Sequence, residues 1–151
     1  MKLATLQFLS LIIFLFLSTM SLVSQESLQN NIADTVIIDF NFDGIEDNVV
    51  GLYTDSTYKI LLISLKTNGI KDTTEISFEL NNGTSFNAFC GSKITLEKEK
   101  LNYNLSEILG AETPGYNQSE KNYGIKLSDG LCDSFHLYWD TKSQMIKYWR
   151  L

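Results

Sequence analysis

Apolar and polar residues alternate with a period of two in several segments of this chain, as in a β-strand that turns one face to a core. In segment 74–80, Ile76, Phe78 and Leu80 share one face and polar side chains take the other. The same alternation occurs over 101–105, 123–127 and 135–139. Turn-forming residues separate these segments, at Asn68-Gly69, Asn81-Asn82-Gly83, Pro114-Gly115 and Asp129-Gly130. The pattern predicts a protein built almost entirely of strands.

Three further segments complete the expected fold. The continuous apolar run within 58–65 predicts a central strand covered on both faces. Residues 140–143 join strands 135–139 and 145–151 into a closing hairpin, and only 106–110 is typical of a helical turn, with Ser106 as its cap. We therefore expect an all-β domain of about eight short antiparallel strands, in a single compact sheet, a sandwich or a small barrel.

The amino terminus has the pattern of a secretory signal peptide. Lys2 precedes an apolar stretch over 3–17, and small and weakly polar residues follow it. We expect cleavage after Ser24, with Ser21 as the alternative site, or else an uncleaved anchor of bilayer-spanning length. Residues 1–24 are then the signal peptide, 25–34 a flexible lead-in and 35–151 the β domain. No membrane span remains after cleavage, so we expect a secreted or periplasmic protein and a monomer.

Charge and composition exclude several classes of function. Without residues 1–24 the chain has 11 basic and 18 acidic side chains, a net charge of −7, and no basic groove for nucleic acid. One His and 2 Cys are too few for a zinc site built from these residues, and no nucleophile motif accompanies His136. We expect no enzymatic activity. His136 lies on the strand face opposite Phe135 and Leu137, which favours a solvent or interface position over a catalytic base.

One motif, Asp39-Phe40-Asn41-Phe42-Asp43-Gly44-Ile45-Glu46-Asp47, carries recognisable chemistry. Calcium binds six to eight oxygens at ~2.3–2.6 Å, and short acidic or amide side chains at every second residue around a tight bend supply them. The pattern predicts a Ca²⁺ site whose ligands are Asp39, Asn41, Asp43, the Ile45 carbonyl and Asp47. Gly44 stands at the bend. The alternative is an acidic turn without a metal, since Asp, Asn and Gly are common turn residues.

The flanks of this motif are β-branched and strand-like, and Val50 stands where an EF-hand has its bidentate Glu. Segment 36–53 instead resembles the FG-GAP or VCBS type of repeat, whose calcium loop bridges two strands of a hairpin. The same five residues fall on that family's ligand positions. Two features depart from the family: Phe42 stands where it usually has Gly, and the loop occurs once. A propeller is excluded, because the 127 residues after residue 24 are too few for at least four blades of four strands. The whole chain resembles small exported bacterial β proteins with one such loop, some of which are similar in fold to periplasmic lysozyme inhibitors.

Two other sets of residues are candidates. An exported chain with two cysteines favours a Cys90–Cys132 disulfide, the alternative being two buried thiols. The aromatic side chains near the carboxyl end could form a binding surface, although the pattern favours core packing and cross-strand pairing in a hairpin. They are Tyr138, Trp139, Tyr148 and Trp149.

These features predict an exported calcium-binding module that acts by binding a protein or glycan partner, for example as an inhibitor. The excess of acidic charge would attract a basic enzyme such as lysozyme. The alternatives are a structural or adhesion component of the cell envelope, and a glycan-active enzyme without a recognisable motif.

Overall fold

The computed structural model describes residues 32–66, 69–80 and 84–151. It contains eight strands and one short helix. The first four strands are β1 (Ile32–Ile38), β2 (Asp47–Tyr53), β3 (Thr57–Leu65) and β4 (Lys71–Glu79). They are followed by β5 (Thr95–Leu101), α2 (Leu105–Leu109), β6 (Ser119–Ser128), β7 (Phe135–Asp140) and β8 (Met145–Trp149).

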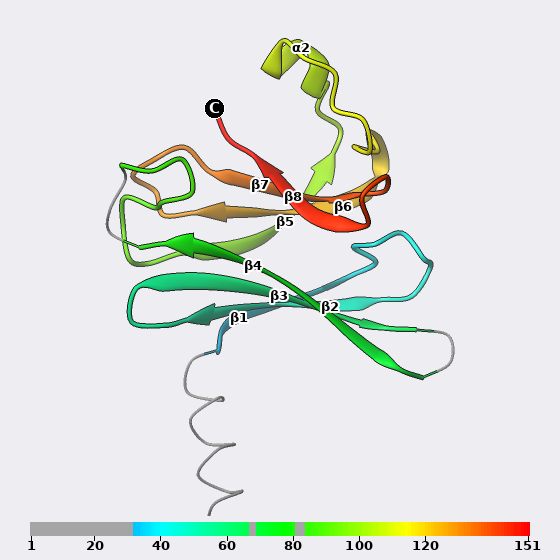
Figure 1. Cartoon of the computed structure of the whole chain (residues 1–151), viewed down its shortest axis with the longest axis horizontal. Helices are drawn as coiled ribbons and strands as arrows, with labels where there is room; N and C mark the ends of the chain where they lie inside the picture. Colours follow the sequence, from blue (N-terminus) through cyan, green and yellow to red (C-terminus); the bar gives the residue numbers. More distant parts are fainter. Residues whose placement is uncertain (1–31, 67–68, 81–83) are drawn as a thin grey trace, which may run out of the picture. The chain divides into compact units, whose positions relative to one another are not determined.

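The strands form two four-stranded antiparallel sheets in simple sequential order, β1-β2-β3-β4 and β5-β6-β7-β8. Figure 1 shows the two sheets stacked as the layers of a sandwich, with α2 beyond the second sheet. The predicted all-β class is thus confirmed. Of the three expected architectures, a single sheet, a sandwich or a small barrel, the strands form a sandwich. Each strand neighbours the next one in sequence, and the connections within a sheet are short loops except that between β5 and β6, which contains α2.

The core lies between the sheets and is rich in aromatic rings. Phe78 of β4 packs against Phe135 of β7 with ring centroids 4.6 Å apart, and Phe89 from the connection between the sheets lies 4.7 Å from Phe135. All three side chains are at most 1% exposed. Pairs of this geometry contribute about 0.5–1.5 kcal/mol each beyond the burial of their area. The aromatic contacts therefore help to hold one sheet on the other.

The predicted strand over 101–105 is wrong. The chain forms β5 over Thr95–Leu101 and then leaves the sheet for α2. Sequence alternation is weak in β5 because it is an edge strand with four consecutive charged residues, 97–100, and few buried side chains. Leu101 and Leu105 are both buried in a second, smaller cluster outside the sandwich, so their apolar character reflects packing against α2 rather than one continuous strand.

Two local expectations also need correction. Burial in β3 alternates, with Tyr58, Ile60 and Leu62 buried and the residues between them partly exposed, so the strand is central in its sheet but fully covered on one face only. The helix begins at Leu105 with Asn104 at its N-cap, not Ser106, and ends at Gly110 with φ 67°.

The predicted signal peptide, 1–24, lies outside the described residues, as does most of the predicted lead-in. β1 begins at Ile32, three residues before the expected start of the β domain and within the last part of that lead-in. Within the residues that the structure describes, no helix has the length and apolar character to cross a membrane.

Candidate functional site

Residues 39–46 form the connection between β1 and β2, as the predicted hairpin loop requires. Its short polar side chains fold back on its own backbone. The Asp43 N–H donates to Asn41 Oδ1 at 2.9 Å, and the Ile45 N–H donates to Asp43 Oδ1 at 2.8 Å. The Gly44 N–H donates to Asp39 Oδ2 at 3.0 Å. The side-chain oxygens of the loop are thus gathered around its backbone instead of extending into solvent.

Asp47, the first residue of β2, connects the end of the loop to its beginning through hydrogen bonds. Its side chain is buried, with 1% exposure. Its Oδ2 accepts the backbone N–H groups of Phe40 at 2.9 Å and Asn41 at 3.2 Å. Hydrogen bonds therefore connect all five predicted ligand residues, directly or through a loop neighbour.

Two carboxylate oxygens of this loop are buried without a hydrogen-bond partner among the described residues, Asp39 Oδ1 and Asp47 Oδ1. A buried polar atom without a partner costs about 1–3 kcal/mol, and more when it is charged. Burial raises the pKa of Asp47 above its ordinary value, and the nearby Ser64 hydroxyl and the two backbone N–H groups on Oδ2 offset only part of the rise. The nearby Asp43 carboxylate raises this pKa further. A bound cation would reverse both effects.

The backbone of the loop turns through left-handed conformations at two residues. Gly44 has φ 86°, as expected of a glycine at the bend, and Phe42 has φ 63°. A bulky residue with positive φ is unusual, and Phe42 occupies the position where the resembling calcium loops have Gly. Its side chain packs against both apolar clusters, which offsets the unfavourable backbone conformation.

The carboxylates do not yet form a coordination shell. No three Asp, Glu, His or Cys side chains of the described ranges come together closely enough to hold a metal. In this arrangement the backbone N–H groups occupy one oxygen of Asp39, Asp43 and Asp47, and Asn41 Nδ2 donates to Asp43 Oδ2 at 3.1 Å. The donor set of three carboxylates, an amide and a carbonyl still fits calcium, which accepts irregular oxygen shells.

A pocket of about 380 Å³ adjoins the loop, which we call the loop pocket. It brings together the loop, the end of β3, the start of β4, and the end of β7 with the β7–β8 turn. Among the described residues it is lined by Asn41, Asp43, Ser64, Lys66, Asp72, Thr74, Trp139 and Gln144. Sequence reasoning missed this pocket because its residues come from three separate segments.

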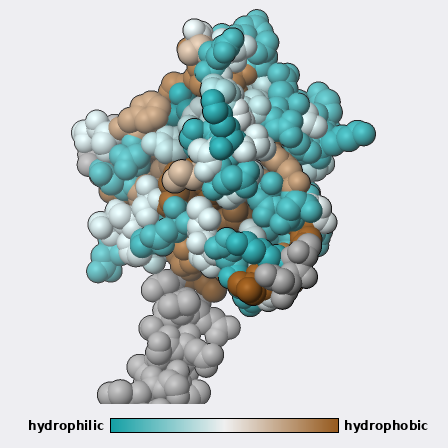
Figure 2. Space-filling model, turned by 45° about the vertical axis from the view of Figure 1, so that its right-hand side comes forward, coloured by the Kyte–Doolittle hydropathy of each residue, from teal (hydrophilic) through white to brown (hydrophobic). Residues whose placement is uncertain are grey.

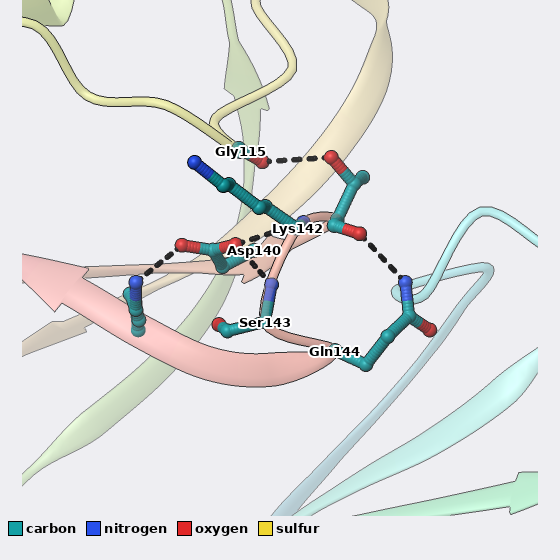
Figure 3. A network of polar contacts seen from close by, with 7 residues as sticks. Gly115, Asp140, Lys142, Ser143 and Gln144 are labelled. Carbon is teal, nitrogen blue, oxygen red and sulfur yellow. Dashed lines mark hydrogen bonds and ion pairs between the residues drawn. The ribbon is translucent and has the colours of Figure 1, made fainter.

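The β7–β8 turn beside the loop pocket is fixed by Asp140, which is 1% exposed. Asp140 Oδ1 accepts the N–H groups of Lys142 at 2.9 Å and Ser143 at 2.8 Å, and Oδ2 forms an ion pair with Lys147 (Figure 3). The Lys147 ammonium, with these N–H groups, lowers the pKa of Asp140 to about 2. Thr141 donates to the Gly115 carbonyl at 3.0 Å from its backbone and 3.2 Å from its hydroxyl. The turn is therefore anchored to its own strand and to the α2–β6 connection.

Cys90 and Cys132 lie together with Cα atoms 5.8 Å apart, which fits the predicted disulfide. Asp129 reinforces the same junction between two loops. Its Oδ2 accepts the N–H groups of Cys90 at 2.7 Å and Gly91 at 2.8 Å, and its Oδ1 accepts those of Leu131 and Cys132 at 2.9 Å. Burial raises the pKa of Asp129, but the four backbone hydrogen bonds outweigh it and the pKa is lowered.

His136 is half-buried and has a partner that sequence reasoning missed. Its Nδ1 lies 2.9 and 3.0 Å from the two carboxylate oxygens of Glu99, and its ring stacks on Trp149 at a centroid distance of 3.9 Å. Glu99 on β5 pairs with Gly124 on β6, so Glu99 has no side chain directly opposite it on β6, although the Leu101 side chain packs over Gly124. A glycine paired with a carboxylate is the one sequence signal of this contact, and it can be recognised only when the register of β5 and β6 is known. We assign the pair a structural role.

The aromatic residues near the carboxyl end do not share one surface. Trp139 and Tyr148 pack with the core between the sheets, whereas Tyr138 and Trp149 belong to the small cluster near α2. Tyr138, Trp139 and Trp149 are at most 8% exposed, so packing accounts for most of their surface. On the face seen in Figure 2, hydrophilic residues predominate and apolar ones appear in scattered spots.

Comparisons with models of protein families, with curated proteins and with solved structures find no match for this chain.

Proposed function

We propose that this chain is an exported binding module whose β1–β2 loop binds calcium. The observation that carries the proposal is the pair of buried carboxylate oxygens without hydrogen-bond partners, Asp39 Oδ1 and Asp47 Oδ1. Oxygens left in this state by a protein are the ligands that a hard cation prefers. The ligand set would be completed by Asn41, Asp43 and the Ile45 carbonyl, with water in the remaining positions.

The sandwich gives the ion a structural task. β1 is an edge strand attached to the rest of its sheet through β2, and the loop connects these two strands. Without a cation, the negative charges of Asp39, Asp43 and Asp47 repel one another within nine residues of chain, which weakens the hairpin. With calcium bound, that repulsion becomes coordination, and both ends of the loop are held together.

Export and macromolecular binding are the remaining parts of the proposal. The apolar amino-terminal segment and the Cys90–Cys132 pair both suit an oxidising compartment. The net charge of −7 calculated for the chain without residues 1–24 favours encounter with a basic partner, including a basic enzyme that such a module could inhibit. We assign the protein no catalytic activity, since its one His is engaged by Glu99 and Trp149.

Thermal melting with calcium, magnesium or EDTA tests the calcium site. If the affinity is about 10 µM, calcium at about 1 mM stabilises the fold by ~2.7 kcal/mol, which raises the melting temperature by roughly 10 °C in a domain of this size. Magnesium should substitute poorly, because it demands a tight octahedral shell. Isothermal calorimetry should show one site.

Two variants and a control make the test specific. Asp47→Asn and Asp43→Ala should both lose the calcium-dependent rise, and Asp47→Asn should melt no lower than wild type in EDTA, because it removes a buried, partly unpaired charge. Asp55→Asn is the matched control, since Asp55 is an exposed acid in the next turn and should keep the full rise. An unchanged melting temperature of wild type on adding calcium, with no heat of binding, would reduce the loop to an acidic turn.

A further inference from the structure

The loop pocket has the size of a small-ligand site, about 380 Å³, where such sites range from ~300 to 1,000 Å³. Seven of its eight lining residues have polar side chains, and the eighth is Trp139. Pockets for apolar ligands have the opposite proportion. The occupant should therefore be a molecule that forms many hydrogen bonds and presents only a small apolar face.

The charges of the lining disfavour an anionic occupant. Lys66 Nζ lies 2.9 Å from Asp72 Oδ2, so these two charges already neutralise each other. Asp43 adds a negative charge that this pair leaves uncompensated, and this charge would repel an anion. Amides, hydroxyls and carboxylates together offer both donors and acceptors, and Asn41 Nδ2 lies 3.4 Å from Ser64 Oγ. Hydroxyl groups, which donate and accept at once, match such a mixture.

Trp139 supplies the apolar face. Its ring belongs to the core between the sheets and is 8% exposed, so the part that lines the pocket is held rigidly. An aromatic edge or face beside hydrogen-bonding groups suits the C–H side of a pyranose ring.

The β7–β8 turn holds Gln144 in place for binding. Asp140 fixes the turn through two N–H groups, and Gln144 Nε2 donates to the Thr141 carbonyl at 2.8 Å. Figure 3 shows the Gln144 side chain reaching from the turn toward the cyan chain that includes the calcium loop. Because its nitrogen is engaged, its amide oxygen is the group left to accept a ligand hydroxyl. Little conformational freedom is lost when a ligand binds such a prearranged group.

We propose that the loop pocket binds a neutral saccharide unit, with Trp139 beside the sugar ring and Asp43, Thr74 and Gln144 as hydrogen-bonding partners of its hydroxyls. A second part of the inference rests on the proposed calcium site. Asn41 and Asp43 belong both to the loop and to the pocket lining, so a cation that fixes these side chains strengthens saccharide binding. The two sites are coupled, and each ligand raises the affinity for the other.

The experiment titrates the mature protein with maltotriose, cellotriose, mannotriose and chitotriose and follows the two tryptophan indole N–H signals by NMR. Trp139 should shift in a saturable way with at least one sugar, with a Kd of about 1 mM or tighter. Trp149 lies in the cluster near α2 and serves as the internal reference. Glucuronic acid should bind more weakly than glucose, because the Asp43 charge opposes it.

Thr74→Val removes one hydroxyl at nearly constant shape and should weaken binding about tenfold. Thr73→Val is the matched control, since Thr73 is the neighbouring residue of β4 and points to the other face of the sheet; its Kd should stay within about twofold of wild type. No saturable Trp139 shift with any of the four sugars up to about 50 mM overturns the proposal, and so does a shift that Thr74→Val leaves unchanged.

Repeating the titration in EDTA separates this inference from the proposed function. Weaker binding in EDTA, by about fivefold or more, supports the coupling. Calcium-dependent melting without saccharide binding overturns the pocket and leaves the calcium site intact. Saccharide binding with no calcium effect on melting overturns the calcium site and its coupling while the pocket stands.

Discussion

Asp129→Asn should be among the most damaging conservative substitutions in this protein. The Asp129 carboxylate accepts four backbone N–H groups, two on each oxygen. Two of the donors lie in its own loop, and the other two, Cys90 and Gly91, are 39 and 38 residues away in the chain. An asparagine keeps one acceptor and places an NH₂ group against two of those donors. Each donor left without a partner costs about 1–3 kcal/mol. We therefore expect a loss of roughly 2–4 kcal/mol in the free energy of unfolding.

Urea unfolding followed by tryptophan fluorescence at pH 7 measures this loss, and melting should fall by roughly 10 °C. The pH dependence gives an independent check. Because the folded-state pKa of Asp129 lies below its unfolded value, the carboxylate stabilises the fold above the unfolded pKa, and this stabilisation disappears as pH falls through the folded pKa. The difference between wild type and Asp129→Asn should therefore shrink in acid.

Asp133→Asn is the control, because Asp133 is an exposed residue of the same loop. It should change stability by less than about 0.5 kcal/mol. If Asp129→Asn changes the urea midpoint as little as Asp133→Asn does, the four hydrogen bonds do not carry the weight given to them.

Two further predictions concern the disulfide and Gly115 of the α2–β6 connection. Breaking the disulfide with Cys90→Ser and Cys132→Ser should cost ~4 kcal/mol for its 42-residue separation in the chain-entropy model. In a double-mutant cycle this loss should not add to that of Asp129→Asn, because the disulfide and the Asp129 carboxylate connect the same two loops. Additive changes in the urea midpoint would contradict this. Gly115→Ala should destabilise by about 3 kcal/mol, because Gly115 has φ 99° and a Cβ there would collide with the Asp140 carboxylate; a melting temperature within about 2 °C of wild type would contradict it.

The sequence was most informative where structure depends on neighbouring residues. Alternation over 74–80 and 135–139 correctly predicts β4 and β7, and the turn residues 140–143 correctly predict the β7–β8 hairpin, although β7 is buried on both faces except at His136. β5 escaped prediction because it lies at an edge and its charges hide the period. The choice between a sheet, a sandwich and a barrel depends on contacts between distant strands, which no local pattern encodes.

In the candidate site, too, the sequence predicted the features that depend on neighbouring residues and not those that depend on distant ones. The five loop residues are contiguous, so their spacing could be interpreted directly, whereas the buried unpaired oxygens of Asp39 and Asp47 emerged only from the fold. The loop pocket joins residues up to 103 positions apart, from Asn41 to Gln144. Likewise, Glu99 and His136 are 37 residues apart and meet only across β6, where Glu99 pairs with Gly124.

The charged strand β5 has a consequence for how the protein behaves at high concentration. As an edge strand it offers unpaired backbone groups to any other extended chain. Lys98 is two residues from the buried Leu96 and so shares its face, and its ammonium lies 3.9 Å from the centre of the Tyr123 ring. Lys98 is exposed at this edge, so a second copy adding itself alongside β5 would have to cover its ammonium and strip it of water. This edge of the sandwich therefore resists the strand-to-strand addition by which β proteins aggregate.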